Sequence, residues 1–273
     1  MGTDLSSASA PTSPDTERLA RLVRDARSVV ALTGAGISVP SGIPDFRTPG
    51  SGLWSQVDPM EVAHIDAFVA DPARFWRFYS QRFTTVADKQ PNDAHRALVQ
   101  MERARLLDGV ITQNVDMLHR KAGTRELVEV HGSIATCSCF ECRASAPLED
   151  VRAMLAAEGR GRERGERERD CVPRCERCGG AMRPDVVLFG ELLPSAALER
   201  AGQLCEGADV LLCVGSSLEV HPVAGLPALV AARGATVAII TTGSTPLDEL
   251  ADVRLHGDVE RELRALVSAL EIA

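Results

Sequence analysis

A buried strand that runs directly into a glycine-rich turn sets the architecture of this chain. Residues 28–32 form an apolar, β-branched run, and Gly34, Ala35 and Gly36 follow. Glycine lets a backbone approach a ligand closely, and the free N–H groups of such a turn, with the start of a helix behind them, bind anionic oxygens. The segment therefore predicts a phosphate-binding turn. It departs from the common dinucleotide fingerprint, because Val39 stands where a third glycine is expected.

Strands and helices alternate along the rest of the chain. The patterns predict helices over 15–27, with Asp15 or Thr16 as cap, 91–106, 195–205 and 259–270, and strands over 110–112, 127–130, 186–189, 210–214 and 237–240. This alternation predicts an α/β fold with a mostly parallel sheet. Strand 210–214 ends in Gly215, Ser216 and Ser217, so a second small polar turn should face the same sheet edge as the first.

Polar residues that could carry chemistry follow two of the predicted strands. Gln113, Asn114 and Asp116 come after strand 110–112, where an open α/β sheet holds its ligand. Alternatively, Asn114 or Asp116 only caps a helix through Leu118. His131 ends strand 127–130 and could accept a proton at neutral pH, or it could be a structural imidazole.

Two CxxC pairs hold four of the eight cysteines: Cys139, Cys142, Cys175 and Cys178. Four thiolates at this spacing match a tetrahedral structural zinc site. An alternative ligand set uses Cys137 or Cys171, which lie just outside the pairs. Cys205 and Cys213 fit apolar core positions.

Composition excludes several classes of protein. With 45% apolar and 25% charged residues, the 273-residue chain is typical of a globular protein. Its formal charge of −8 argues against non-specific nucleic-acid binding. No apolar run is long enough to span a membrane and no secretion signal is visible, so we expect a cytoplasmic location. Residues 1–14 should form a flexible tail, and the mixed-charge segment 159–170 should form a solvated loop.

Ordered motifs between about residues 28 and 265 together identify a family. They read GAGIS, PDFR, TQNVD, HG, paired CxxC, FGE and GSSLEVHP. In these motifs the chain resembles the sirtuins, the NAD-dependent protein deacylases, in their bacterial type. The resemblance implies a Rossmann-like domain, and a smaller lobe made of a zinc ribbon and a helical insertion, with NAD and an acyl-lysine protein meeting between them. The Rossmann-like domain would comprise residues 15–47, 108–132 and 184–273, and the small lobe a helical insertion over 48–107 and a zinc module over 133–183.

The resemblance also implies roles for individual residues. The NAD site would contain Gly34, Ala35, Gly36, Phe46, Arg47, Gln113, Asn114, Val115, Asp116, Gly215, Ser216, Ser217, Thr241 and Asp258. Phe46 would shield the nicotinamide–ribose bond, and Asn114 and Asp116 would position the nicotinamide and its ribose. His131 would take a proton from a ribose hydroxyl, so that this oxygen attacks the carbon of the acyl group. Thr241 stands where many sirtuins place an Asn for the adenosine ribose.

The substrate is expected to add as a strand between two segments of the chain. The residues implied are Val187, which would line the lysine tunnel, with Phe189, Gly190 and Glu191 on one side and Leu218 and Val220 on the other. Tyr79 and Arg82 are similar to the pair that desuccinylases of the family use to bind an acyl carboxylate. Asp45, however, stands where that branch carries Thr, and the alternative is a core Tyr79 beside a solvated Arg82.

The expected function is that of an NAD-dependent protein-lysine deacylase with structural zinc, which removes acetyl groups. Succinyl and malonyl groups are further candidate substrates, because Tyr79 and Arg82 could bind their carboxylate. Protein ADP-ribosyl transfer on the same fold is the alternative. An NAD-sensing zinc-ribbon module without turnover is a third hypothesis, which the presence of His131 and Asn114 disfavours. The sequence leaves the oligomeric state open.

Overall fold

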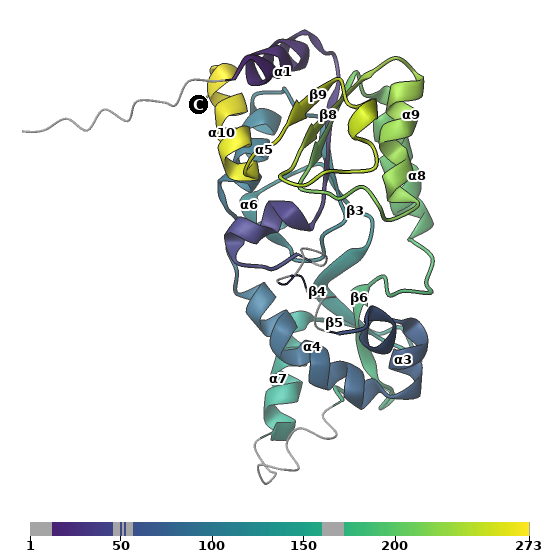
Figure 1. The fold of residues 1–273 in the computed structure, drawn as a ribbon. Coiled ribbons are helices and arrows are strands. Elements are labelled where there is room, and N and C mark those ends of the chain that lie inside the picture. Colours follow the sequence, from purple (N-terminus) through teal and green to yellow (C-terminus); the bar gives the residue numbers. More distant parts are fainter. Residues whose placement is uncertain (1–12, 46–49, 51, 53–56, 160–171, 273) are drawn as a thin grey trace, which may run out of the picture.

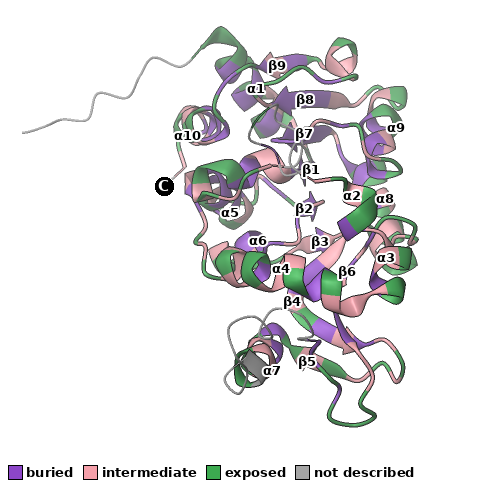
Figure 2. Ribbon diagram, turned by 60° about the horizontal axis from the view of Figure 1, so that its bottom comes forward, coloured by how far each residue is buried: buried purple, intermediate pink, exposed green. Residues whose placement is uncertain are grey.

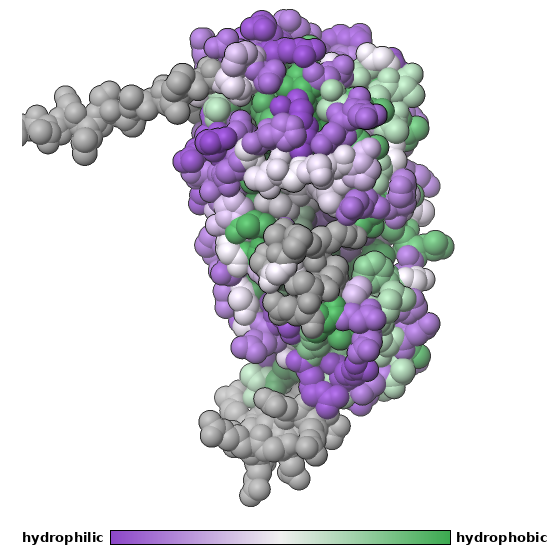
Figure 3. Space-filling model, in the orientation of Figure 1, coloured by the Kyte–Doolittle hydropathy of each residue, from purple (hydrophilic) through white to green (hydrophobic). Residues whose placement is uncertain are grey.

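The chain folds into a large and a small lobe (Figure 1). The structure is a computed structural model and describes residues 13–45, 50, 52, 57–159 and 172–272. None of the helices in these ranges is long and apolar enough to cross a membrane. Hydrophilic side chains cover much of the face shown in Figure 3.

The large lobe contains a six-stranded parallel sheet in the order β3-β2-β1-β7-β8-β9. Its strands are β1 Val29–Thr33, β2 Gly109–Thr112, β3 Leu127–Glu129, β7 Val210–Val214, β8 Thr236–Ile240 and β9 Val253–Leu255. The predicted parallel sheet is confirmed, although β9 was not predicted. The strand order reverses at β1, between β2 and β7. Open α/β sheets bind ligands at such a switch point, beyond the carboxyl ends of the strands.

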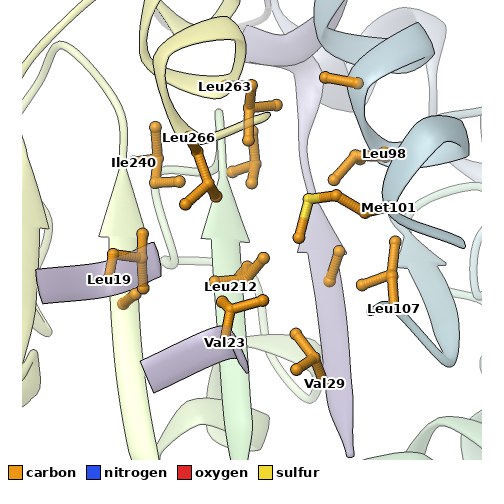
Figure 4. Packing of buried hydrophobic residues seen from close by; sticks show 14 of the residues in the cluster. Leu19, Val23, Val29, Leu98, Met101, Leu107, Leu212, Ile240, Leu263 and Leu266 are labelled. Carbon is orange, nitrogen blue, oxygen red and sulfur yellow. The ribbon is translucent and has the colours of Figure 1, made fainter. Parts of the chain in front are cut away.

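Helices cover both faces of this sheet, which explains why every residue of β1 and β7 is buried (Figure 2). One face packs against α1 Pro14–Asp25, α5 Asp93–Arg103 and α10 Val259–Ala269, and the other against α8 Ser195–Gly207 and α9 Leu226–Ala232. Figure 4 shows the first core, where the labelled residues include Leu19, Val23, Leu98, Met101, Leu263 and Leu266. Cys205 and Cys213 lie in the second core, as predicted.

The predicted cap of α1 is wrong. Ser13 is the N-cap, and its Oγ accepts the N–H of Thr16 at 3.1 Å. Pro14 then occupies the first turn, where its missing N–H costs nothing. Asp15 and Thr16 therefore lie inside the helix.

The small lobe has a three-stranded sheet and an aromatic core. The sheet runs β5-β4-β6, with β4 Gly132–Cys139, β5 Ser145–Pro147 and β6 Met182–Val186, and its helices are α2 Pro59–Val62, α3 Ile65–Ala70, α4 Pro72–Ala87 and α7 Leu148–Gly159. Phe68, Phe75, Trp76 and Phe83 are buried together. The Nε1–H of Trp76 donates to the carbonyl of Met182 at 2.8 Å, which ties α4 to β6.

The predicted strand 186–189 is also wrong. Its first residue ends β6, which pairs antiparallel with β4 in the small sheet and does not join the large one. Phe189 instead forms a parallel bridge to His64. An apolar run does not reveal its pairing partner, and so the sequence could not assign it to a sheet.

Candidate active site and metal centre

Two glycine-rich turns touch at the switch point. The N–H of Gly36 donates to the carbonyl of Gly215 at 2.7 Å, and the N–H of Gly34 donates to Val214 at 3.1 Å. A Cβ added at Gly36 would lie 2.7 Å from that Gly215 oxygen, and one at Gly34 would lie 2.8 Å from Cα of Ser216. Only glycine permits this approach. The predicted meeting of the two turns at one sheet edge is confirmed, and a 3-10 helix, η1 Ala35–Ser41, follows the first turn.

The segment after β2 joins the first turn through buried side chains. Asn114 donates from Nδ2 to the carbonyl of Gly34 at 3.0 Å and to Oγ of Ser38 at 3.2 Å. Ser38 donates to Oδ2 of Asp116 at 2.6 Å. Asp116 also accepts the N–H of Leu118 at 2.9 Å, at the start of α6 Leu118–Ala122. Asp116 therefore bonds the start of α6 and also joins η1 through Ser38.

Burial raises the pKa of Asp116, although the bonds from Ser38 and Leu118 act in the opposite direction. Gln113 contacts the second glycine-rich turn, where its Nε2 donates to Oγ of Ser216 at 2.9 Å. Ser38 was not among the predicted site residues. Its signal was its place at the end of the GAGIS motif, just after the turn that is predicted to bind phosphate.

His131 lies half-buried at the end of β3, next to this segment. Its Nδ1 is 3.1 Å from the carbonyl of Gln113. Because a carbonyl only accepts, Nδ1 carries the proton, and Nε2 keeps a lone pair. Burial lowers the pKa of His131, against a smaller opposing effect of that bond. The imidazole is thus mostly neutral at pH 7, with Nε2 as a hydrogen-bond acceptor.

The two CxxC pairs meet in the small lobe. The four Sγ atoms of Cys139, Cys142, Cys175 and Cys178 lie within 4.8 Å of one another. The Sγ atoms of Cys139 and Cys178 are 3.5 Å apart, and those of Cys142 and Cys175 are 3.7 Å apart. A tetrahedral ion with Zn–S bonds of about 2.3 Å requires S···S edges of about 3.8 Å. The set fits zinc, and its four ligands leave no open position.

Cys137 is buried in the small-lobe core and is not part of this group. Cys171, Phe46 and Arg47 fall outside the described residues. The predicted CxxC set is therefore the group that the described cysteines form.

The predicted substrate segment is held by its own backbone and by an ion pair. Phe189 donates its N–H to Ala63 at 2.9 Å and accepts from Ile65 at 3.0 Å. Val187 donates to the carbonyl of His131 at 2.9 Å, so this segment lies directly beside the predicted base. The guanidinium of Arg183 donates to both carboxylate oxygens of Glu191, at 2.7 and 2.6 Å.

Four further predicted residues lie in the loops that follow β6 and β7. Gly190 has a φ of +86°, and a Cβ there would lie 2.6 Å from Nε2 of His64. Leu218 is buried with a φ of 54°, and its N–H donates to Oγ of Ser216 at 3.2 Å. The carbonyl of Val220 accepts the N–H of Ala224. Ser217, which precedes Leu218, is half-buried.

The residues predicted for the adenosine half of NAD follow β8 and β9. Thr241 follows β8 and donates its N–H to Leu255 at 3.2 Å. Asp258 is the N-cap of α10 and accepts the N–H groups of Glu260 and Arg261 at 3.1 and 3.0 Å. Its side chain thus has a structural role at the helix start.

Tyr79 and Arg82 lie one turn apart on α4, and each has its own partners. The ring of Tyr79 stacks on Phe83 with centroids 4.9 Å apart and tilts against Phe75 at 4.5 Å. Arg82 donates to the carbonyl of Phe78 at 2.6 Å and lies 3.7 Å over the centre of the Phe78 ring. Burial raises the pKa of Tyr79 to about 12.

Comparison with known proteins agrees with this geometry. The model of the Sir2 family matches residues 34–222. NAD-dependent protein deacylase 1 of Archaeoglobus fulgidus is 39% identical over 251 residues, which are 92% of this chain and 96% of that protein. NAD-dependent protein deacylase of Thermococcus kodakarensis is 44% identical over 238 residues, or 87% and 89% of the two chains.

Solved structures of Sir2 proteins also superpose on this chain. A Sir2 protein described with a deacetylated p53 peptide and 3'-O-acetyl ADP-ribose has a TM-score of 0.86 and 35% identity, and covers 94% of this chain and 99% of its own. A structure described as Sir2 bound to acetylated peptide has a TM-score of 0.83 and 34% identity, with the same coverage. The Rossmann-like sheet, the second small sheet and the four-cysteine group together confirm the predicted fold class. The chain belongs to the Sir2 family, the sirtuins.

Proposed function

We propose that the chain is an NAD-dependent protein-lysine deacylase, which transfers an acyl group from lysine to ADP-ribose and releases nicotinamide. The observation that carries the proposal is the hydrogen-bonded contact of the glycine-rich turn, Asn114 and Asp116 beside a neutral His131. The relatives named above carry this activity in their names. ADP-ribosyl transfer, the alternative from the sequence, has no such support.

The residues at the switch point suit NAD. The turns at residues 34–36 and 215–217 pack against each other at the carboxyl ends of β1 and β7, where an open α/β sheet holds its ligand, and we assign both turns to the NAD phosphates. NAD supplies a cleavable bond between nicotinamide and ribose, whose cleavage leaves ADP-ribose to accept the acyl group. We assign Asn114, Asp116, Gln113 and Val115 to the nicotinamide half and Thr241 and Asp258 to the adenosine half. From the sequence motif alone, Phe46 and Arg47 are assigned to the same cofactor.

His131 is the proposed general base. Its Nδ1–H is fixed by the Gln113 carbonyl, so its Nε2 lone pair is free to take a proton from a ribose hydroxyl. A neutral imidazole is needed for this step, and burial maintains that state at pH 7 by lowering the pKa. We assign zinc a purely structural role, because four thiolates fill a tetrahedral ion.

The acyl-lysine substrate is proposed to lie between residues 189–191 and 218–220, with Val187 near the lysine end, because Val187 is bonded to His131. We propose acetyl as the acyl group. Arg82 is engaged by the carbonyl and ring of Phe78 and would have to leave both to bind a carboxylate. Succinyl and malonyl removal through Tyr79 and Arg82 remains the alternative.

The test is product analysis after incubation with NAD and matched acetyl-lysine and succinyl-lysine peptides. Mass spectrometry should find O-acetyl-ADP-ribose and free nicotinamide, whereas an ADP-ribosylated protein would support the other reaction. Arg82→Ala should leave acetyl turnover unchanged. If succinyl turnover exceeds acetyl turnover and Arg82→Ala removes it alone, the acetyl assignment is wrong. The cytoplasmic location stays a prediction.

A further inference from the structure

Two buried histidines lie together beneath the proposed nicotinamide site. His95 on α5 and His119 on α6 are 0% and 2% exposed, and their ring centroids are 4.8 Å apart. Neither has a role in the proposed function. Within the described part of the chain, Nε2 of His95 and Nδ1 of His119 have no hydrogen-bond partner. Buried polar groups are normally hydrogen-bonded. Each ring makes its bonds through its other nitrogen, and those bonds indicate the role of each histidine.

The bonded nitrogens fix the tautomers of both rings. Nδ1 of His95 is 2.9 Å from Oδ1 of Asn92, and since an amide oxygen only accepts, this nitrogen carries the proton. Nε2 of His119 is 2.9 Å from Oγ1 of Thr33. The single hydroxyl proton of Thr33 is donated to Oγ1 of Thr112 at 2.8 Å. His119 must therefore be the donor to Thr33.

These bonds form a relay that ends on the proposed active-site segment. From His119 Nε2–H the relay passes to Thr33 and then to Thr112, which sit opposite each other in adjacent strands β1 and β2. Oγ1 of Thr112 also accepts the backbone N–H of Asn114 at 3.1 Å. The Asn114 backbone is thus bonded to a hydroxyl that is linked to His119 through Thr33.

His95 supports η1, the other segment of the same site, through Asn92. The Asn92 side chain that it holds donates from Nδ2 to the carbonyl of Ile37 at 2.7 Å and to Oγ of Ser41 at 3.0 Å. Ile37 and Ser41 belong to η1, which carries Ser38. The two imidazoles therefore support the two segments that meet in the bonds of Ser38 with Asn114 and Asp116.

We propose that His119 is a positioning residue for deacylation, which orients Asn114 through the hydroxyls of Thr33 and Thr112 as a neutral Nε2–H donor. This inference rests on the proposed function, because it assigns Asn114 to the nicotinamide half of NAD. Small displacements of a positioning group lower the rate of the chemical step more than they weaken binding.

The kinetic test compares His119→Gln, whose side-chain amide can supply the N–H, with His119→Leu, which cannot. His119→Leu should lower kcat by about tenfold or more with KM for NAD changed by less than about threefold, while His119→Gln should stay within about threefold of wild type. Thr33→Val should act like His119→Leu, and the double variant should lose no more than the worse single variant, because the two remove one relay.

A packing control separates this role from stability. Ile239→Val, on the opposite side of the sheet, should lower Tm as a buried truncation but keep kcat. The proposal is overturned if His119→Gln and His119→Leu lower kcat equally, or if the losses in kcat only follow the losses in Tm.

A nitrogen-15 NMR experiment keeps this inference separate from the proposed function. His119 should show a protonated Nε2 and a bare Nδ1 from pH 5 to 8, and His119→Leu should shift the amide resonance of Asn114. If wild type shows this tautomer and this shift but deacylates no peptide, the relay stands and the proposed function fails. The opposite tautomer, or an unmoved Asn114 amide, overturns the relay whatever the activity.

Discussion

The hydroxyl of Ser38 lies 2.6 Å from a carboxylate oxygen of Asp116, and both side chains are buried. This bond joins η1 to the segment after β2, two parts of the chain that are far apart in sequence. A buried carboxylate costs free energy, and the donors Ser38 and Leu118 offset only part of that cost. Burying Asp116 therefore lowers the stability of the fold, while its two hydrogen bonds fix the orientation of the carboxylate.

Asp116→Asn should abolish most activity and raise stability at pH 7 by on the order of 1 kcal/mol. An Asn can keep both bonds, since its oxygen accepts from Leu118 and its amide donates to Ser38. The sign follows from the raised pKa of Asp116: the folded state holds the proton more tightly, so stability falls as pH rises from the unfolded value toward the folded one. The gain in Tm should thus shrink as the pH falls from 7 toward the unfolded pKa of about 3.8. An equal gain at pH 7 and at pH 4 would contradict this explanation.

Gly36→Ala should prevent NAD binding and cost about 1–3 kcal/mol of stability. The added Cβ would lie 2.7 Å from the Gly215 oxygen, which is backbone and cannot rotate away. Gly202→Ala, where a Cβ meets nothing within 4 Å inside α8, is the matched control and should bind NAD normally. Calorimetric titration with NAD measures both variants, and tight binding by Gly36→Ala would rule out the turn as the phosphate site.

Cys142→Ser should remove bound zinc and unfold the small lobe, because structural zinc contributes folding free energy directly. Two ligands, Cys139 and Cys175, are also part of that lobe's hydrophobic core. Elemental analysis should find one zinc per wild-type chain and per Cys205→Ala chain, which changes only the large-lobe core. Retention of full zinc by Cys142→Ser would show that another residue completes the set.

Arg254→Met should raise KM for NAD by about five- to tenfold with little change in kcat. The guanidinium donates to the carbonyls of Thr241, Ile239 and Leu255 at 3.0, 3.3 and 3.1 Å, and to Asp248 at 3.0 Å. It thus fixes the loop at the proposed adenosine end, and losing charge-assisted bonds loosens it by on the order of 1–3 kcal/mol. Steady-state kinetics should show no change for Arg200→Met, which removes an exposed ion pair between Arg200 on α8 and Glu126. A fall in kcat at constant KM would place Arg254 elsewhere in the mechanism.

How far the sequence predicted the fold depends on whether the signal was local. The buried strands β1, β2, β7 and β8 were found because continuous apolar runs end in polar turns. The three-residue β9 gave too short a pattern, and the pairing of residues 182–189 is a long-range choice that no local pattern reveals.

The site shows the same division. The CxxC spacing predicted the zinc cysteines, whereas Asn114, Asp116 and His131 were singled out by the resemblance to the sirtuins, because their residue types alone also fitted structural roles. The roles of Ser38 and His119 depend on which side chains meet across β1 and β2, and only the folded arrangement supplies that.

The most direct test of the account is the pH dependence of deacylation by wild type and His131→Ala. Wild type should form one O-acetyl-ADP-ribose per nicotinamide, with kcat/KM rising with pH to a plateau by pH 7, because the pKa of His131 is below its usual 6.5 and the base must be neutral. His131→Ala should be slower by a factor of about 10²–10⁴ with the rise removed. An unchanged rate and profile in His131→Ala would contradict the assignment of His131 as the base, and no acyl transfer by wild type would contradict the function itself.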